Sequence, residues 1–407
     1  MFKTVAVSLN QVQSCEFADQ LQSVAALAAL FVPLYERSGV LPTFYKNAPA
    51  RLSKVNTLGS YEIKFQDQMR SCEDVLLIEQ HHLAIVACDA GRERWNTVMG
   101  ISLPGDVSSA ELWAYNYESS SKPEAESLTR VQLEDFPSTQ DFHTLGIAYD
   151  QETSSLFVTN HAKAGPRIEV FKLDIESLTA TYIRTIRHPL IHAPNAISLI
   201  NSHEFYVTNA HGISMKQSKI LSLVETYLSI PLGTVVYVNL EDAQPQAKVV
   251  ARVAFANGVE ILNSSTVAVA STSRVAVCLF NTPDKTTFEL HSKIRLPFLP
   301  DNLSWSGGKL LIAGHAHAPS LTKFTHTRHI CNDAEELRNA ATDMREYCAT
   351  GEATSWVSEW SEEEGLKHLY VDTKYPTSTT ACKDSARGVG IVSGLYSKGL
   401  LVWREDR

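Results

Sequence analysis

The chain has 407 residues, a formal net charge of −9 and 44% hydrophobic residues. This composition is typical of a globular protein, and the length exceeds what one minimal core needs unless the architecture is repetitive. The acidic balance and the lack of a basic stripe or an RNA-binding motif argue against a nucleic-acid partner.

Residues 1–60 are expected to form an N-terminal helical or targeting segment. A helix is predicted across Ala18–Tyr35, in which Val24–Tyr35 is rich in alanine and leucine. This apolar run is short for a membrane span. A buried or amphipathic helix and a membrane-associating helix are both compatible with it. We therefore expect a secreted or membrane-associated protein, and a cytoplasmic location stays open.

From residue 61 onwards, one short pattern recurs along the chain. An acidic or amide residue begins an apolar run, a polar turn follows, and a second apolar run ends the unit, which is the pattern of a β-hairpin. The clear copies are Ser71–Ala87, Asn195–Asn209, Asn257–Ala270 and Asp301–Ala313, and two looser copies are Leu145–Asn160 and Val389–Trp403. Six spaced hairpins predict an all-β fold, a six-bladed β-propeller, over residues 61–407.

Two regions read as helical rather than extended. Gln217–Ser229 is predicted to be a helix lying over one end of the propeller. Residues 321–385 are expected to be a helical insertion before the last hairpin, with an amphipathic helix at Asp333–Cys348. A lid over the propeller and a helical patch on a blade edge are both compatible with this insertion.

The seven cysteines do not form the framework of a small disulfide-rich fold, because the chain is too long for one. Cys72, Cys88 and Cys278 fall within or beside apolar strands and are expected to be buried free thiols. The candidates for a disulfide lie in one polar region and are Cys331, Cys348 and Cys382.

The first residues of the predicted inner strands have oxygen-bearing side chains that could bind a metal ion. In a propeller these strands run beside the central axis, so the residues that begin them face a common point. They are Glu73, Asn195, Asn257, Asp301 and Asn302. All of them offer hard oxygen atoms, which are the ligands that calcium prefers. The repeat therefore predicts both a fold and a calcium site at its centre.

The chain resembles the serum paraoxonase/arylesterase family of six-bladed, calcium-dependent propeller hydrolases. The motifs that carry the likeness are Cys72-Glu73-Asp74, Asn160-His161, Phe255-Ala-Asn257-Gly258 and Pro300-Asp301-Asn302-Leu-Ser304. The likeness extends from about residue 70 to residue 317 and over the last hairpin. It implies a hydrolase of lactones or aryl esters whose catalytic calcium is held by the same five residues that the repeat selects.

The resemblance also assigns roles around the ion. His161 matches one member of the family's proposed catalytic histidine pair, and the other member maps onto Leu145, with His143 two residues earlier. His161 and His143 are thus the expected catalytic residues. The residues that match the family's substrate pocket are Phe255, His315 and His211.

A second, structural calcium of the family is matched only in part. Asp74 and the backbone carbonyl of Ile147 match two of its ligands, but Ala196 stands where the family has its second carboxylate. A second ion is therefore not expected to bind in the same way.

The expected mechanism is attack by water on a carbonyl that calcium polarises, with His161 or His143 removing the proton directly or through a relay. No Gly-x-Ser-x-Gly motif indicates an acyl-enzyme. A strictosidine-synthase-like propeller enzyme and a non-catalytic interaction module remain as alternatives. Two glycosylation sequons are present, and Asn263-Ser-Ser265 is a better acceptor than the axial Asn302-Leu-Ser304 if the protein is secreted.

Overall fold

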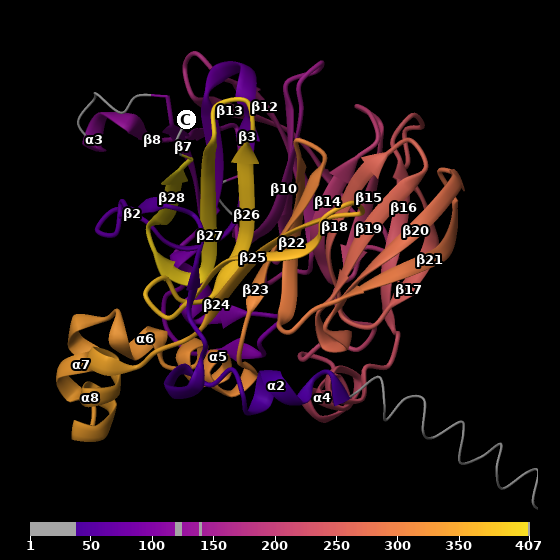
Figure 1. Ribbon diagram of the computed structural model, residues 1–407. Helices are drawn as coiled ribbons and strands as arrows, with labels where there is room; N and C mark the ends of the chain where they lie inside the picture. The colour runs from indigo at the N-terminus through magenta and orange to yellow at the C-terminus, as the bar shows by residue number, and fades with distance from the viewer. Residues whose placement is uncertain (1–37, 119–123, 138–140, 406–407) are drawn as a thin grey trace, which may run out of the picture.

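The computed structural model describes residues 38–118, 124–137 and 141–405. Across these residues, the sheets resolve into antiparallel units of four strands. The innermost strands are β3 (Arg70–Ile78), β10 (Thr144–Asp150), β14 (Pro194–Leu199), β18 (Ala256–Asn263), β22 (Leu299–Ser306) and β26 (Ser378–Asp384). Each contacts the next, and β26 contacts β3, so these strands form a closed ring. Figure 1 shows β10, β14, β18 and β22 near the middle of the molecule and the outer strands β17 and β21 at its edge. The predicted all-β propeller is confirmed.

The remaining strands of the first three blades follow in chain order. Blade 1 adds β4 (Leu83–Cys88), β7 (Glu111–Asn116) and β8 (Leu128–Arg130). Blade 2 adds β11 (Ser155–Asn160), β12 (Arg167–Asp174) and β13 (Thr179–Ile186), with β9 (Gln132–Glu134) parallel to β13. Blade 3 adds β15 (Glu204–Asn209), β16 (Gly233–Asn239) and β17 (Gln246–Val253).

Blade 4 is built from consecutive strands, whereas blades 5 and 6 each add a strand from the N-terminal part of the chain. Blade 4 adds β19 (Thr266–Ser271), β20 (Ala276–Asp284) and β21 (Thr287–Arg295). Blade 5 adds β23 (Lys309–His315), β24 (Ser355–Ser361) and β25 (Gly365–Asp372), with β1 (Val55–Asn56) paired to β25. Blade 6 adds β27 (Val389–Lys398), β28 (Leu400–Arg404) and β2 (Ser60–Lys64). Because β2 comes from the N-terminal side, its pairing with β28 closes the ring.

The apolar core lies between adjacent blades. Val235 of blade 3 and Val269 of blade 4 belong to one buried cluster, and Phe157 of blade 2 packs against Phe205 of blade 3 with ring centroids 5.6 Å apart. Each sheet is buried on both faces by its neighbours, so its strands read as near-continuous apolar runs. This packing fixes the blades around the axis.

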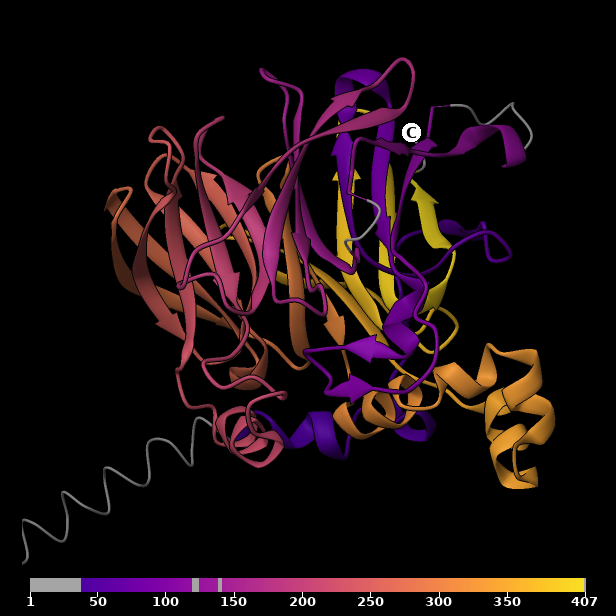
Figure 2. The ribbon, with the colours of Figure 1, turned by 180° about the vertical axis from the view of Figure 1, so that it is seen from behind.

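Most of the helices gather at one end of the propeller. Helices α2 (Leu41–Phe44), α4 (Lys219–Leu228) and α5 (Ala318–Thr325) lie together there, as both views show (Figures 1 and 2). The other helices are α3 (Glu124–Ser127), α6 (Arg328–Cys331), α7 (Ala334–Asn339) and α8 (Thr342–Thr350), and a small hairpin is formed by β5 (Trp95–Asn96) and β6 (Ile101–Ser102). Within the described part of the chain, no helix has the length and apolarity needed to cross a bilayer.

The helical insertion is shorter than predicted. It spans residues 318–350, whereas β24, β25 and β26 occupy most of residues 355–384. The expected helix at Asp333–Cys348 is two helices, α7 and α8, because Ala340 and Ala341 are extended. The inner strand of blade 6 is β26, and the hairpin Val389–Trp403 lies outside it. Strand β26 was missed because its channel-facing residues are polar, which removes the apolar run that marks the other strands.

Two further expectations concern the N-terminus and the cysteines. The helix predicted at Ala18–Tyr35 lies outside the described residues, and β1, inside the expected N-terminal segment, belongs to blade 5. Cys331 and Cys348 form a disulfide. Cys72 and Cys88 were wrongly expected to be free, since they pair with each other. They face each other directly on β3 and β4, which brings their Cα atoms within 3.8 Å.

Candidate active site

A β-bulge occurs at the same place in every inner strand. Where each inner strand pairs with the next strand of its blade, the register shifts by one extra residue. A bulge takes a residue out of the ladder and re-aims its side chain. These bulges define two rings around the channel. The first ring is Glu73, Leu145, Asn195, Asn257, Asp301 and Thr379, and the second ring is Asp74, Gly146, Ala196, Gly258, Asn302 and Thr380.

Each ring borders its own cavity. First-ring residues line a cavity of about 370 Å³, whose mouth is formed by α2, α4 and α5. Second-ring residues line a cavity of about 210 Å³ on the other side. The structure therefore brings four of the predicted calcium ligands, Glu73, Asn195, Asn257 and Asp301, to one cavity. The fifth, Asn302, borders the adjoining cavity and reaches back to Glu73.

Glycines in the second ring allow the inner strands to approach closely. A Cβ atom on Gly146 would lie 2.4 Å from the carbonyl oxygen of Asn195, and one on Gly258 would lie 2.7 Å from the amide nitrogen of Leu303. Only a residue without a side chain fits such a contact. Glycine at these two positions therefore allows the narrow spacing between neighbouring inner strands at the rings.

Four predicted ligands carry a buried oxygen that has no hydrogen-bond partner among the described residues. These atoms are Oε2 of Glu73, Oδ1 of Asn195, Oδ1 of Asn257 and Oδ1 of Asn302. Native proteins rarely leave buried polar atoms unpartnered, and each one costs about 1–3 kcal/mol. The four oxygens come from four different blades. Such a donor set fits a hard divalent cation, which would give these four oxygens a partner.

The predicted donor set contains amides as well as carboxylates. Among the described residues, no group of three or more histidine, cysteine, aspartate and glutamate side chains is placed to hold a metal. Two carboxylates and three amides make up the predicted set instead. Thr379 in the first ring adds another buried oxygen, Oγ1, that has no partner within the described part of the chain. The sequence pattern did not indicate Thr379, because it did not indicate strand β26, in which Thr379 lies.

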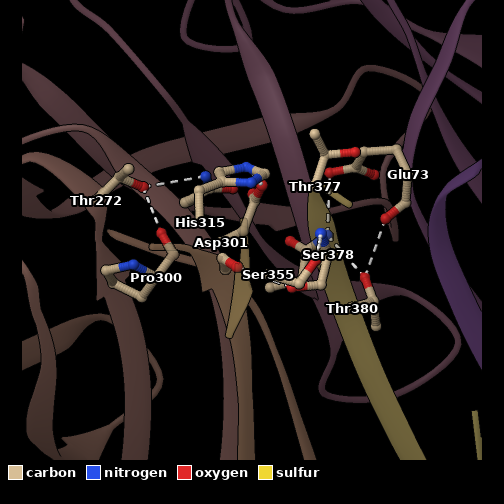
Figure 3. A network of polar contacts seen from close by, with 12 residues as sticks. Glu73, Thr272, Pro300, Asp301, His315, Ser355, Thr377, Ser378 and Thr380 are labelled. Carbon is tan, nitrogen blue, oxygen red and sulfur yellow. Dashed lines mark hydrogen bonds and ion pairs between the residues drawn. The ribbon is translucent and has the colours of Figure 1, made fainter. Parts of the chain in front are cut away.

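Hydrogen bonds orient the ligand side chains (Figure 3). The amide of Asn302 donates to Oε1 of Glu73 at 3.0 Å. The amide of Asn257 donates to Oγ1 of Thr272 at 3.1 Å, which leaves Oδ1 of Asn257 for another partner. Nε2 of His315 donates to Oδ2 of Asp301 at 2.9 Å. These contacts fix which oxygen of each side chain is available.

The site concentrates negative charge in a dry environment. Burial raises the pKa of the Glu73 carboxyl well above its usual range, and the neighbouring Asp74 and Asp301 raise it further. Burial also raises the pKa of Asp74 to about 6, although hydrogen bonds from Ile147, Thr380 and Val75 oppose this shift. Buried carboxylates that repel one another are stabilised by a bound cation.

Two of the predicted pocket histidines line the first cavity. His315 lies beside Asp301, and its Nδ1 is buried without a partner among the described residues. His211 packs its ring against Phe255, with centroids 4.3 Å apart. Burial lowers the pKa of His211 to about 4, so its ring is neutral near pH 7. The three predicted pocket residues therefore meet in one cavity.

The two predicted catalytic histidines lie behind this wall. Nε2 of His161 donates to the carbonyl of Pro194, and its Nδ1 accepts from the hydroxyl of Thr97. Burial lowers the pKa of His161 to about 4. Nδ1 of His143 is 3.2 Å from Oδ2 of the buried Asp89. Neither histidine is among the residues that line the cavity of about 370 Å³, whereas Leu145 is.

Comparisons with known proteins place this chain in a family. The Arylesterase family model matches residues 119–345, which is more than half of the 407-residue chain. The chain belongs to the arylesterase family. Serum paraoxonase/arylesterase 2 of Canis lupus familiaris is 29% identical over 174 residues, 42% of this chain and 47% of the relative. Serum paraoxonase/lactonase 3 of Oryctolagus cuniculus is 26% identical over 186 residues, 45% of this chain and 51% of the relative.

These alignments cover about half of the length of each relative. Among solved structures, a luciferin-regenerating enzyme is similar with a TM-score of 0.50 and 9% identity, over 87% of this chain and 96% of that one. At that identity the likeness concerns the fold alone.

This arylesterase-family chain differs from the expected second calcium site. The carboxylate of Asp74 accepts from the amide nitrogens of Ile147 at 2.8 Å and Val75 at 2.9 Å, and from the hydroxyl of Thr380 at 2.9 Å. Ile147 thus contributes its N–H to Asp74. Ala196 lines the same cavity without a donor atom. That a second ion does not bind here as it does in the family stays a prediction, and Ala196 offers no side-chain oxygen for such an ion.

Side chains that the sequence did not indicate form the walls of the first cavity. They include Val98, Met99, Met215, Leu223, Leu299, Leu321 and Leu395. They come from two loops, two helices and two strands, so no local pattern marks them. The arylesterase-family cavity is therefore polar at its floor and apolar along its sides.

Proposed function

We propose that this protein is a calcium-dependent hydrolase of lactones or aryl esters. Its membership of the arylesterase family supports a small ester as the substrate. The observation that carries the proposal is the convergence of unpartnered, buried oxygens from Glu73, Asn195, Asn257 and Asn302 on one narrow section of the channel. That donor set is suited to one calcium ion.

A calcium ion at this point would polarise a carbonyl oxygen and stabilise the negative charge that develops on it. The chain's own residues prepare the position. Thr272 and His315 hold the side chains of Asn257 and Asp301 in single orientations through hydrogen bonds. Thr272 is itself held, because its hydroxyl donates to the carbonyl of Pro300 at 2.7 Å. Preorganised ligands of this kind lose little conformational freedom on binding.

The cavity walls select the remainder of the substrate. The side chains of Met99, Met215 and Leu223 offer an apolar surface between the ligand ring and the mouth. A lactone or ester whose carbonyl points to the ring would bury its alkyl or aryl part against these residues. Water would reach the carbonyl carbon from the open side of the ring.

Proton removal from that water is the step where this chain departs from its family. His161 has both ring nitrogens in hydrogen bonds to Thr97 and Pro194, and His143 lies against Asp89. Leu145 stands between them and the cavity as the one first-ring residue without a polar side-chain atom. In the proposed mechanism, His161 and His143 therefore act on the water through a relay, without touching the substrate.

The decisive experiment combines metal analysis with turnover. Protein purified in calcium-containing buffer is analysed for bound metal and then assayed on a panel of lactones and on phenyl acetate. We expect one tightly bound calcium per chain and turnover that a chelator removes and calcium restores. Calcium binding without turnover of any ester would indicate a non-catalytic propeller. Turnover that persists after complete chelation would contradict the proposal.

A further inference from the structure

An exposed sequon lies at the tip of the inner hairpin of blade 4. Asn263 and Thr266 are paired at the turn between β18 and β19, and residues 263–265 are exposed. The side chain of Asn263 forms a local turn, in which Oδ1 accepts from the amide nitrogen of Ser265 at 2.9 Å and from its hydroxyl at 3.1 Å. Both hydrogen bonds use Oδ1, so neither occupies the amide nitrogen that would be modified.

The second sequon of the chain serves as an internal contrast. Asn302 is 3% exposed, and its amide nitrogen donates to Glu73 and Thr380. No transferase could reach this atom in the folded chain. The structure therefore separates two identical sequence signals, one accessible and one enclosed at the propeller axis.

The redox chemistry of the chain agrees with a compartment in which such modification occurs. The pairs Cys72–Cys88 and Cys331–Cys348 are disulfides. Disulfides persist mainly in secreted proteins and in the secretory pathway, where glycosylation of asparagine sequons also takes place.

A large groove begins at the same hairpin tip. It has a volume of about 680 Å³, runs between blades 4 and 5, and has Asn263 in its wall. The half-buried indoles of Trp305 and Trp360 line it together with polar side chains such as Asn281 and Lys309. Flat aromatic faces beside hydrogen-bonding groups suit the mixed apolar and hydroxylated faces of a sugar ring.

We propose that Asn263 carries an N-linked glycan and that the first sugars of this glycan lie in the groove between blades 4 and 5. In the transfer, Nδ2 of Asn263 forms a bond to the anomeric carbon of a lipid-diphosphate-linked oligosaccharide. The bond from that carbon to the diphosphate oxygen breaks, the lipid diphosphate leaves, and the amide loses one proton. This modification is independent of the proposed hydrolase activity.

The attachment is tested on the full chain produced in cultured eukaryotic cells. Intact-mass measurement before and after treatment with a peptide-N-glycosidase should show one glycan on the wild-type protein and on Ser265→Thr, and none on Asn263→Gln or Ser265→Ala. Asn201→Gln is the control, because Oδ1 of Asn201 forms the same kind of turn with His203 at a hairpin tip but no hydroxyl follows two residues later. The amide nitrogen of Asn201 differs from that of Asn263 in that it donates to Glu204 at 2.6 Å. Asn201→Gln should keep the glycan.

A further variant serves as a positive control for glycosylation of this chain in the cells used. His203→Ser introduces a sequon at Asn201 and should add a second glycan. A wild-type protein without a glycan overturns the proposal, whether or not the His203→Ser protein is modified. A glycan found on Asn302 would contradict it equally.

The position of the sugars is tested by thermal unfolding. Enzymatic removal of the glycan should lower the Tm of the wild-type protein and shift its tryptophan emission, and both effects should be smaller in Trp360→Leu. Equal Tm values with and without the glycan would show that the sugars project into solvent, which would overturn the groove assignment.

Discussion

The amide of Asn302 donates a hydrogen bond of 3.0 Å to the carboxylate of Glu73, although the two residues are 229 positions apart. This contact links blade 5 to blade 1 across the channel. It also defines which oxygens stay free, since Oε2 of Glu73 and Oδ1 of Asn302 have no partner among the described residues. The proposed calcium site follows from this pair and from its counterparts on blades 3 and 4.

Replacement of Asn257 by alanine should remove ester hydrolysis. The change deletes one oxygen of the proposed ligand set and leaves Thr272 without its amide partner. We expect kcat/KM to fall by about 100-fold or more, as for other losses of electrostatic stabilisation. Asn263→Ala is the matched control, because Asn263 ends the same strand at the exposed hairpin tip. Equal activity of the two variants would argue against a metal role for Asn257.

Glu73→Gln should change stability in opposite directions without and with calcium. Burial and the carboxylates of Asp74 and Asp301 disfavour the charged form of Glu73, so the neutral isostere should raise the Tm of metal-free protein. A ligand present at 100 times its Kd stabilises the folded state by about 2.7 kcal/mol. Wild-type protein should therefore gain Tm on addition of calcium, and Glu73→Gln should lose most of that gain. Differential scanning calorimetry measures both. A calcium-induced gain of the same size in both proteins would exclude Glu73 as a ligand.

Leu145→His should increase turnover. Leu145 occupies the first ring and lines the cavity at the position where the family places a histidine. An imidazole there would contact the attacking water, and general-base assistance contributes about 100-fold or more when the geometry is favourable. Activity of this variant should rise with pH as the imidazole loses its proton. Leu145→Gln, which is polar but cannot act as a base near neutral pH, should not show this pH dependence. A Leu145→His protein no faster than wild type would show that proton removal does not limit the rate.

His161 should make the folded state sensitive to acid. Burial lowers its pKa to about 4 in the folded protein, whereas an unfolded histidine titrates near 6.5. Between these values the unfolded state binds more protons, so stability falls as the pH drops from about 6.5 to about 4. The shift corresponds to roughly 3 kcal/mol at the acid end.

Urea unfolding across this pH range checks the prediction. His161→Gln should lose less stability than the wild type on acidification. His203 is exposed, so the free energy of unfolding of His203→Gln should change with pH as that of the wild type does. Parallel curves for His161→Gln and wild type would mean that His161 is not the group that responds to acid.

The Cys331–Cys348 disulfide should hold the cavity wall as well as the insertion. It joins α6 to α8 with a sequence separation of 17 residues. Helix α5, which directly precedes α6, supplies Leu321 to the cavity, and its C-cap residue His326 also lines the cavity. A loop of this size is expected to contribute about 3 kcal/mol. Cys331→Ser with Cys348→Ser should lower Tm and raise KM, with a smaller effect on kcat. An unchanged KM would show that the disulfide-bonded insertion does not contribute to substrate binding.

Much of the fold and of the proposed ligand set follows from local sequence pattern. Residues such as Asn195 and Asn257 begin apolar runs of similar length, and the repetition of that pattern already implies convergence on an axis. The helix at Lys219–Leu228 was also predicted, because its apolar residues recur at helical spacing.

Other features depend on contacts that sequence spacing does not encode. The pairing of Cys72 with Cys88 depends on the register between β3 and β4. Strand β26 is recognisable only from its neighbours, since its polar residues are buried by packing against β22 and β3.

The sequence thus indicated which residues lie around the axis, whereas the pairing of the strands decided which way their side chains point. A bulge between Thr144 and Ile147 breaks the alternation of β10, so the face of a residue in this stretch does not follow from the sequence alone. It is this one extra residue, fixed by pairing with β11, that presents Leu145 to the cavity and leaves His143 against Asp89.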